Sequence, residues 1–342
     1  MSAPLHNVII GGGSAGYGAA MTLRARDASC RISMITMDSL PFYNRYDLPK
    51  VFRGSHDWRK LLAVPPAQYD ALDIRLRRAS RVVDVNGANR IVTLAHQETI
   101  PYDRLLVCTG GRSYLPENLN ECAGLIHHFG SFEAAMRAAQ ALPDGGRVIM
   151  IGGDMIGIDL ALTLLDTGHH VTLIANEQTF WPHVVAAKQR AALLAALAAR
   201  GMTVIDANRP VGVVAGKRGK PARCVTLEDG SEIAGDVVMA FCGIVPSVEF
   251  MLGAGIDIER GILVDPHLHT TDEAIWAAGD VCQIWNDKAK SYNFYHGWGN
   301  VRVMGELAAR NMSGADEVFD VNVADRIDID DQGNLRSTFW TH

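Results

Sequence analysis

The residues with the clearest potential for chemistry are the glycine-rich residues 11–16, Gly-Gly-Gly-Ser-Ala-Gly. They follow an apolar run at residues 8–10 that predicts a buried strand, and they precede an alanine-rich helical pattern over residues 19–26. The first glycine permits a tight turn, the third lets a pyrophosphate approach the backbone, and the last lets the helix pack closely on the strand. We therefore expect five residues to bind a dinucleotide: Gly11, Gly13, Ser14, Ala15 and Gly16. The alternative is a glycine-rich turn without a ligand.

The adenosine ribose of such a ligand needs a hydrogen-bond acceptor at the end of the next strand, about twenty residues past the glycines. Residues 31–36 predict that strand. Thr36 and Met37 at its end are not acidic, but Asp38 is, and it is the candidate ribose ligand. The alternative for Asp38 is an ordinary loop aspartate.

Composition limits the function classes. The 342 residues suffice for two domains, and 48% hydrophobic with 20% charged residues is typical of a globular chain. The net charge of −6 argues against a nucleic-acid-binding surface. We find no apolar run of membrane-spanning length and no basic segment of a signal peptide at the N-terminus, so we expect a cytoplasmic protein.

The cysteine spacing predicts neither a metal site nor a redox disulfide. None of the six cysteines forms a C-x-x-C or another close pair. Zinc and iron–sulfur sites are therefore poorly supported, and buried free thiols are the default interpretation for Cys108 and Cys242.

Residues 41–54 form an aromatic, basic, proline-punctuated stretch that predicts a loop holding a ligand. Tyr43-Asn44-Arg45, followed by Leu48 and Lys50, resembles the Tyr-x-Arg-Pro-x-Leu-Ser-Lys stretch of FAD-dependent ferredoxin and rubredoxin reductases. The flavin half of NADH nitrite reductases is similar, and all belong to the pyridine-nucleotide-disulfide oxidoreductase superfamily.

The resemblance implies that Arg45 helps to hold FAD and that Lys50 lies beside its isoalloxazine ring. The chain departs from the pattern at three positions, where the usual prolines and serine are replaced by Tyr46, Asp47 and Pro49. A solvated basic loop is the alternative interpretation.

Three later elements strengthen the resemblance. Residues 102–110 are similar to the element that ends the first flavin segment of the superfamily, which implies FAD contacts at Thr109 and Gly110. Residues 275–281 resemble the element whose aspartate bonds the FAD ribityl chain, which implies roles for Gly279 and Asp280. Trp298 matches a tryptophan beside the isoalloxazine, although it could also be an interdomain packing residue.

A second nucleotide unit begins near residue 146, with a strand at residues 147–151 and a second glycine turn. Gly152 and Gly157 match its outer glycines, but Asp154 stands at the middle position, where bulk and charge oppose a pyrophosphate. The strand at residues 171–175 ends without an acidic residue, and Glu177 two residues later is the candidate ribose ligand. No basic residue occurs in residues 175–177, which favours NADH over NADPH. The alternative is a structural relic.

Asp159 occupies the position at which these flavoproteins commonly carry a glutamate that pairs with the lysine matched by Lys50. Burying that lysine alone would be costly, and a carboxylate offsets the cost. The resemblance thus implies catalytic roles for Lys50, Asp159 and Trp298.

We predict an α/β fold of two nested Rossmann-like, three-layer nucleotide-binding domains with small antiparallel insertions. The expected FAD domain comprises residues 1–112 and 241–314, and the NAD(P)H-like domain residues 113–240. The superfamily would normally continue with an α+β interface domain, whereas residues 315–342 predict a short tail with one hairpin.

The predicted function is electron transfer between NAD(P)H, with NADH favoured, and a small iron–sulfur or rubredoxin-like protein. Without a dithiol, FAD itself must be the relay. The alternative is a FAD-carrying subunit of a larger redox complex with a degenerate nicotinamide site. Neither the acceptor nor the direction of electron flow follows from the sequence.

Overall fold

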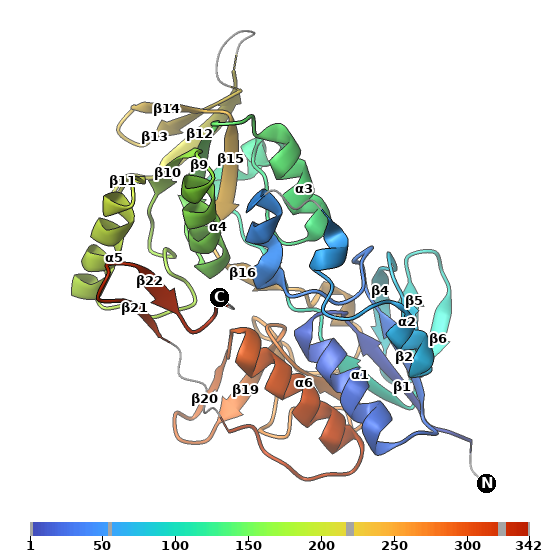
Figure 1. Ribbon diagram of the computed structural model, residues 1–342. Coiled ribbons are helices and arrows are strands. Elements are labelled where there is room, and N and C mark those ends of the chain that lie inside the picture. The colour runs from blue at the N-terminus through green and yellow to red at the C-terminus, as the bar shows by residue number, and fades with distance from the viewer. Residues whose placement is uncertain (1–2, 54–56, 217–221, 321–325, 341–342) are drawn as a thin grey trace. The chain divides into compact units, whose positions relative to one another are not determined.

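The computed structural model describes residues 3–53, 57–216, 222–320 and 326–340, and the chain divides into two units (Figure 1). Unit 1 comprises Met1–Asn44, Leu62–Arg112 and Val245–Val323. Unit 2 comprises Arg45–Leu61, Ser113–Ile244 and Ala324–His342. Each unit is built around a parallel sheet of its own.

A five-stranded sheet in the order β18-β7-β1-β2-β3 forms the centre of unit 1, and all of its neighbouring strands are parallel. Its strands are β1 (His6–Ile10), β2 (Arg31–Ile35), β3 (Ile74–Arg77), β7 (Arg104–Val107) and β18 (Ile275–Ala277). Every residue of β1 is buried, as expected for a central strand covered on both faces.

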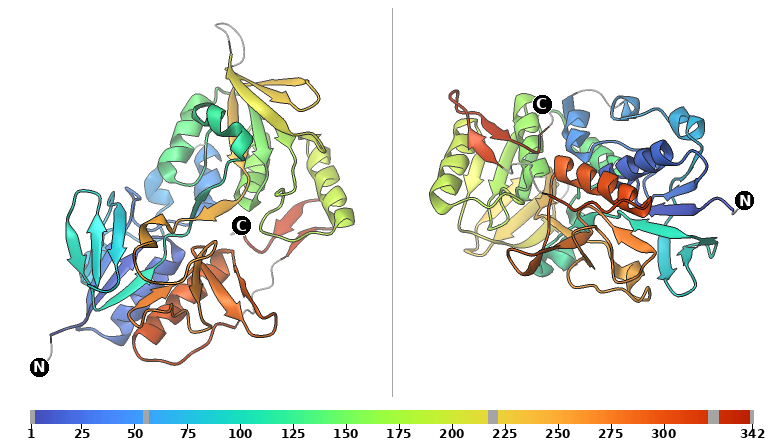
Figure 2. Two further views of the ribbon diagram at one scale, coloured as in Figure 1. Left: turned by 180° about the vertical axis from the view of Figure 1, so that it is seen from behind. Right: turned by 90° about the horizontal axis from the view of Figure 1, so that it is seen from below.

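Two long helices of unit 1 lie side by side, α1 (Ser14–Arg26) and α6 (Trp298–Met312) (Figures 1 and 2). Their close approach depends on Gly305, because a Cβ atom there would overlap the carbonyl oxygen of Ala15. The packing therefore places the beginning of α1 directly against α6.

The remaining elements of unit 1 are short. They are α2 (Ala67–Ala71), the antiparallel strands β4 (Val82–Asn86), β5 (Ile91–Leu94) and β6 (Thr99–Pro101), the 3-10 turn η4 (Glu249–Met251), and the strands β17 (Ile262–Val264), β19 (Cys282–Asn286) and β20 (Ser291–Asn293). The strands β8 (Gly111–Ser113) and β16 (Ile244–Pro246) contain two of the points at which the chain passes between the units.

Unit 2 contains a four-stranded parallel sheet in the order β11-β10-β9-β15. Its strands are β9 (Arg147–Gly152), β10 (His170–Ile174), β11 (Thr203–Ile205) and β15 (Val237–Phe241). The helices are α3 (Phe132–Ala141), α4 (Met155–Asp166) and α5 (Ala187–Ala199), with the 3-10 segments η1 (Arg45–Arg53), η2 (Trp58–Lys60) and η3 (Glu117–Leu125). The antiparallel strands are β12 (Pro210–Ala215), β13 (Arg223–Leu227), β14 (Glu232–Gly235), β21 (Ile327–Ile329) and β22 (Leu335–Ser337).

The predicted fold class is confirmed, since two parallel sheets with helices are present and β4, β5 and β6 form an antiparallel insertion. The division along the chain differs from the expected boundaries, because residues 45–61 and 324–340 join unit 2. The helix α5 begins at Ala187, because the preceding residue, Ala186, is extended. Part of the expected tail strand, residues 321–325, lies outside the described residues.

The α1–α6 contact yields a stability prediction. We expect Gly305→Ala to lower the free energy of unfolding by about 1–3 kcal/mol, because the backbone of Ala15 cannot yield to an added methyl group. Gly18→Ala is the matched control on the same pair of helices, since its Cβ would meet the flexible Glu306 side chain at 3.3 Å and the carbonyl oxygen of Arg302 at an ordinary contact distance of 3.5 Å. Urea unfolding of both variants measures the difference, and equal stabilities would contradict the close approach.

Candidate functional site

The first glycine turn is open at the start of α1. Gly11 has a φ of +117°, and a Cβ there would overlap the carbonyl oxygen of Cys108, so only glycine fits this position. Gly13 is the N-cap residue of α1, with an extended backbone and no side chain that caps the helix. Helix N-termini carry unsatisfied N–H groups and the positive end of the dipole. The first turn of α1, from Ser14 onward, therefore suits an anion.

Two other predicted elements converge on this turn. The amide of Ala278, just after β18, donates to the carbonyl of Val107 at the end of β7 (3.0 Å). A Cβ on Gly279 would lie 3.5 Å from the Cβ of Ala15. Thr109 donates its hydroxyl to the carbonyl of Ser247 (2.9 Å), which holds the turn that includes Gly110. The carboxyl ends of β1, β7 and β18 thus bring three separate motifs to the N-terminus of α1.

Asp280 has a partner that sequence reasoning missed. Its Oδ1 lies 2.7 Å from Nδ1 of His296, and both side chains are less than one-third exposed, at 28% and 17%. The side-chain amide of Asn300 donates to the backbone carbonyl of His296 (2.9 Å) and so fixes the backbone of that residue. Sixteen residues separate Asp280 and His296, so no local spacing predicts this pair. The only hint in the sequence was the aromatic stretch that contains His296.

Asp38 lies just beyond the end of β2, as expected. The hydroxyl of Tyr43 donates to its Oδ1 (3.1 Å), and its own amide donates to the hydroxyl of Thr36 (3.1 Å). These contacts orient a half-buried carboxylate at the carboxyl end of the parallel sheet. A ribose hydroxyl can donate to such a group.

Trp298 is the first residue of α6. The preceding N-cap residue, Gly297, has a φ of +95° and provides no side-chain cap. The guanidinium of Arg302 lies 5.8 Å from the centre of the Trp298 ring. The positive end of the α6 dipole is therefore also unopposed by a capping side chain.

Arg45 and Lys50 both lie on η1, in unit 2. Arg45 donates from Nε to the carbonyl of Gly130 (2.9 Å). Lys50, whose side chain is 46% exposed, lies 2.6 Å from the carboxylate of Asp47. We expected Lys50 to pair with Asp159, but the ion pair that forms uses Asp47, because a 3-10 helix eclipses residues three apart. Asp159 is buried on α4, at 4% exposure.

The second glycine turn supplies its own acceptors. Asp154 is the N-cap residue of α4, and its Oδ1 accepts from the amide of Gly157 (2.9 Å). The amides of Ile156 and Gly243 help to lower the pKa of this carboxylate. The amide of Met155 donates to the carbonyl of Trp181 (3.0 Å). Two of the first three N–H groups of α4, those of Met155 and Gly157, therefore have acceptors within the chain.

The Asp154 carboxyl group has a pKa close to neutral pH. Burial raises its pKa to about 6, although the hydrogen bonds from three amides lower it. The neighbouring Cys242 thiol has a pKa raised to about 11, mainly by burial, and so stays neutral. Above pH 6 a negative charge thus stands where the phosphate of a dinucleotide would approach. The two glycine turns, Gly11–Gly16 and Gly152–Gly157, differ chiefly in this carboxylate.

At the end of β10 a basic side chain is present that the local sequence does not show. Ala175 is buried, and Glu177 is exposed, with its carboxylate 3.8 Å from the guanidinium of Arg209. Both side chains are largely exposed, so this pair contributes little to stability. A basic side chain therefore does approach Glu177, but from a residue 32 positions later. A role of Glu177 in ribose binding stays a prediction.

Two further findings concern what the described residues lack. Among them, no group of three histidine, cysteine or acidic side chains is placed to hold a metal ion. No helix within the same residues is both long and apolar enough to cross a membrane.

The chain resembles known reductases over most of its length. A ferredoxin–NAD(+) reductase component of an anthranilate 1,2-dioxygenase system from Burkholderia cepacia is 32% identical over 318 residues, covering 91% of this chain and 76% of that protein. A rubredoxin–NAD(+) reductase from Pseudomonas putida is 27% identical over 275 residues, which cover 80% of this chain and 71% of that protein. The crystal structure of a ferredoxin reductase from Rhodopseudomonas palustris superimposes with a TM-score of 0.83 at 25% identity, covering 92% and 78% of the two chains.

The match extends to the family level. Residues 5–304 match the family described as pyridine nucleotide-disulphide oxidoreductase, which is most of the chain. That span includes both glycine turns and the Asp280 element. The protein therefore belongs to the pyridine nucleotide-disulphide oxidoreductase family, whose members are oxidoreductases that use FAD and NAD(H).

Proposed function

We propose that this protein transfers electrons between NADH and a small iron–sulfur or rubredoxin-like protein by means of FAD. The similar proteins named above are reductases of ferredoxin and rubredoxin, and this supports a protein partner of the same chemistry. The observation that carries the FAD part is the uncapped N-terminus of α1, onto which the ends of β7 and β18 converge.

Unit 1 has the groups that FAD needs. The first-turn amides of α1 suit the pyrophosphate, and Asp38 suits the adenosine ribose. Asp280, held by His296, suits the hydroxyls of the ribityl chain. We assign the backbone of residues 109–110 and 279 to the border of the ligand, because these residues follow β7 and β18 at the N-terminus of α1. The resemblance further assigns Arg45 and Lys50 to FAD, and these two roles stay predictions.

The redox chemistry belongs to the cofactor. All six cysteines are free, and burial raises the pKa of the Cys108 and Cys282 thiols well above the usual value. Because the thiolate is the reactive form, neutral thiols argue against a dithiol relay. When bound, FAD supplies two-electron exchange with a nicotinamide and single-electron exchange with a protein partner. The contribution of the chain is to bind and orient it, and the positive end of α6 beside Trp298 favours negative charge there.

We include a cytoplasmic location in the proposal. Free thiols persist in the reducing cytoplasm, where NADH is also available. The six free cysteines of this chain, four of them buried, agree with that compartment.

A second function is favoured by the self-capped turn of α4. If Asp154 excludes the nicotinamide nucleotide, the protein would be a FAD-carrying subunit of a larger redox complex. Anaerobic stopped-flow mixing with NADH separates the two functions. Bleaching of the flavin band within about a second, as turnover rates of ordinary enzymes require, supports the reductase, and an unchanged band after minutes supports the subunit.

FAD retention yields the first prediction of this proposal. We expect Gly13→Asp to abolish flavin retention, because a carboxylate at the N-cap of α1 would take the amides that the pyrophosphate needs. Asp154 already does this at α4. The ratio of flavin to protein absorbance after purification with added FAD measures it. Gly124→Asp, at an open position of unit 2, is the control, and a fully yellow Gly13→Asp protein would refute the FAD site.

Nicotinamide affinity yields the second prediction. We expect Asp154→Gly to tighten NADH binding about tenfold, which corresponds to about 1.4 kcal/mol, because it removes both the charge and the occupant of the amides. NADH should gain more than NADPH, and FAD content should stay unchanged because the two turns are separate. Asp154→Asn is the matched variant, since asparagine still caps a helix but carries no charge.

The comparison of these two variants separates charge from occupancy. Equal gains in NADH affinity would show that charge repulsion limits binding. A gain in Asp154→Gly alone would show that binding is limited by the side chain that occupies the helix amides. An unchanged dissociation constant in both would rule out Asp154 as the cause. The apparent constant comes from the NADH dependence of anaerobic flavin bleaching.

The pH dependence yields the third prediction. The pKa of Asp154 is about 6 in the folded protein, so its carboxylate is negative at pH 7.5 and mostly protonated at pH 5.5. Repulsion of the NADH phosphates therefore disappears as the pH falls through 6, and NADH should bind more tightly at pH 5.5. Asp154→Asn should remove this dependence. If the NADH affinity of the wild type varied with pH in the same way as that of Asp154→Asn, the pH dependence would not come from Asp154.

A further inference from the structure

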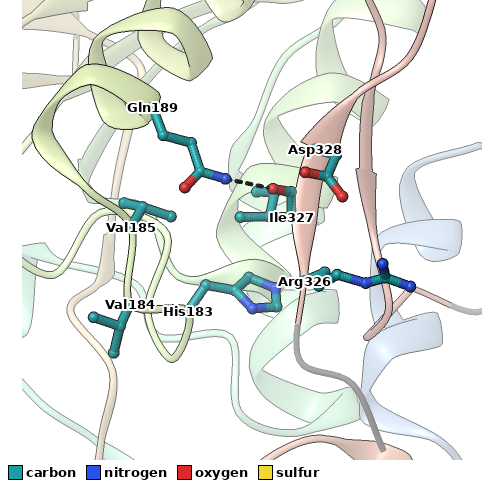
Figure 3. Close-up of a pocket in the computed structure, with 7 residues that line it drawn as sticks. All are labelled: His183, Val184, Val185, Gln189, Arg326, Ile327 and Asp328. Atoms are coloured by element: carbon teal, nitrogen blue, oxygen red, sulfur yellow. Dashed lines mark hydrogen bonds between the residues drawn. The ribbon is translucent and has the colours of Figure 1, made fainter.

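The C-terminal residues 326–340, which we call the tail hairpin, are docked onto unit 2. In Figure 1, β21 and β22 lie beside α5. The side-chain amide of Gln189 on α5 donates to the carbonyl of Ile327 (2.8 Å), as Figure 3 shows. Near the other end of α5, the guanidinium of Arg200 donates to the side chain of Asn334 (3.0 Å). The hairpin is thus held at its first strand and at the turn before its second strand.

The docking buries apolar side chains. Ile327, Leu335 and Phe339 are each less than 5% exposed. The ring of Phe339 stacks on His183, with 4.7 Å between centroids, and Nε2 of His183 lies 2.9 Å from the hydroxyl of Ser337. A two-stranded hairpin is at best marginally stable in water, so its order depends on these contacts with the rest of unit 2.

The contact is incompletely packed at one side. A solvent-open pocket separates the loop before α5 from the first strand of the hairpin, and Figure 3 shows the side chains that line it. They are His183, Val184, Val185, Gln189, Arg326, Ile327 and Asp328. Val184 at this pocket is fully exposed. An open pocket at this contact favours reversible docking, because it leaves fewer van der Waals contacts than a filled interface would.

The end of the hairpin reaches the second glycine turn. The indole N–H of Trp340 donates to the carbonyl of Met155 (2.9 Å), the first residue of α4. Met155 directly follows Asp154, whose carboxylate takes the amides of the same helical turn. The carbonyl of Trp181 takes the amide of Met155. Three segments of the chain therefore meet where a dinucleotide phosphate would approach α4.

We propose that the tail hairpin is an intramolecular cover of the nicotinamide site, which NADH must displace from the N-terminus of α4 in order to bind. This inference rests on the proposed function, because it concerns the regulation of the same nucleotide site. The coupling is reciprocal, so docking of the hairpin weakens NADH binding and NADH weakens docking by the same factor. A protein partner that grips the hairpin would thereby raise the affinity for NADH.

Two variants of the full-length flavoprotein test the cover. Phe339→Ala removes the buried ring, and Trp340→Phe removes only the indole donor. Arg336→Gln is the control, because Arg336 bonds Asp330 within the hairpin (3.0 Å) and its side chain is 62% exposed. We expect the NADH dissociation constant to fall about fivefold or more in Phe339→Ala, by less in Trp340→Phe, and not at all in the control. FAD content and thermal melting confirm that each variant is folded.

Amide hydrogen exchange provides a second readout on the wild-type protein. Saturating NAD+ should accelerate exchange at residues 327–329 and 335–337 if the hairpin is displaced. Equal NADH constants in all variants, with exchange unaffected by bound NAD+, would overturn the cover and leave the reductase function intact. Flavin that NADH bleaches in no variant would overturn the reductase function and the cover with it. Bleaching in Phe339→Ala with a silent wild type would support both.

Discussion

The amide groups at the start of a helix need acceptors, and the source of those acceptors distinguishes the two halves of this protein. Both α1 and α4 begin at the carboxyl end of a central parallel strand, immediately after a glycine turn. At α1 the N-cap residue is Gly13, and no side chain competes for the amides. At α4 the Asp154 carboxylate and the Trp181 carbonyl already accept from them. The first turn of α1 therefore has no side-chain cap, whereas the first turn of α4 is capped by Asp154.

This difference suits the two roles that a flavin reductase needs. A resident cofactor benefits from donors that nothing in the chain satisfies, because binding then supplies hydrogen bonds that the free protein lacks. A nicotinamide substrate must arrive and leave, and at the second turn the Asp154 carboxylate, whose pKa is about 6, already accepts from a helix amide. The tail hairpin reaches the same helical turn through Trp340, whose indole N–H donates to the carbonyl of Met155.

Much of the architecture could be predicted because its signals are local. An apolar strand, a glycine turn and a helix follow one another within about twenty residues, and steric rules connect them directly. The same holds for the antiparallel strands β4, β5 and β6, whose turns are visible in the sequence. The partner of Lys50 is also local, since Asp47 lies three residues away. We missed it because the resemblance directed attention to Asp159 instead.

The sequence by itself determined the two strand–turn–helix units, the position of Asp154 at the second turn and the family of the chain. Only the tertiary structure decided which distant side chains meet. His296 joins Asp280, Arg209 approaches Glu177, and Trp340 reaches Met155 across 185 positions. Such pairs leave no periodic trace, because they depend on how loops and strand ends are packed and not on the spacing of residues along one element. For the same reason, the sequence placed a carboxylate at the second turn, but only the fold showed that it caps the helix there.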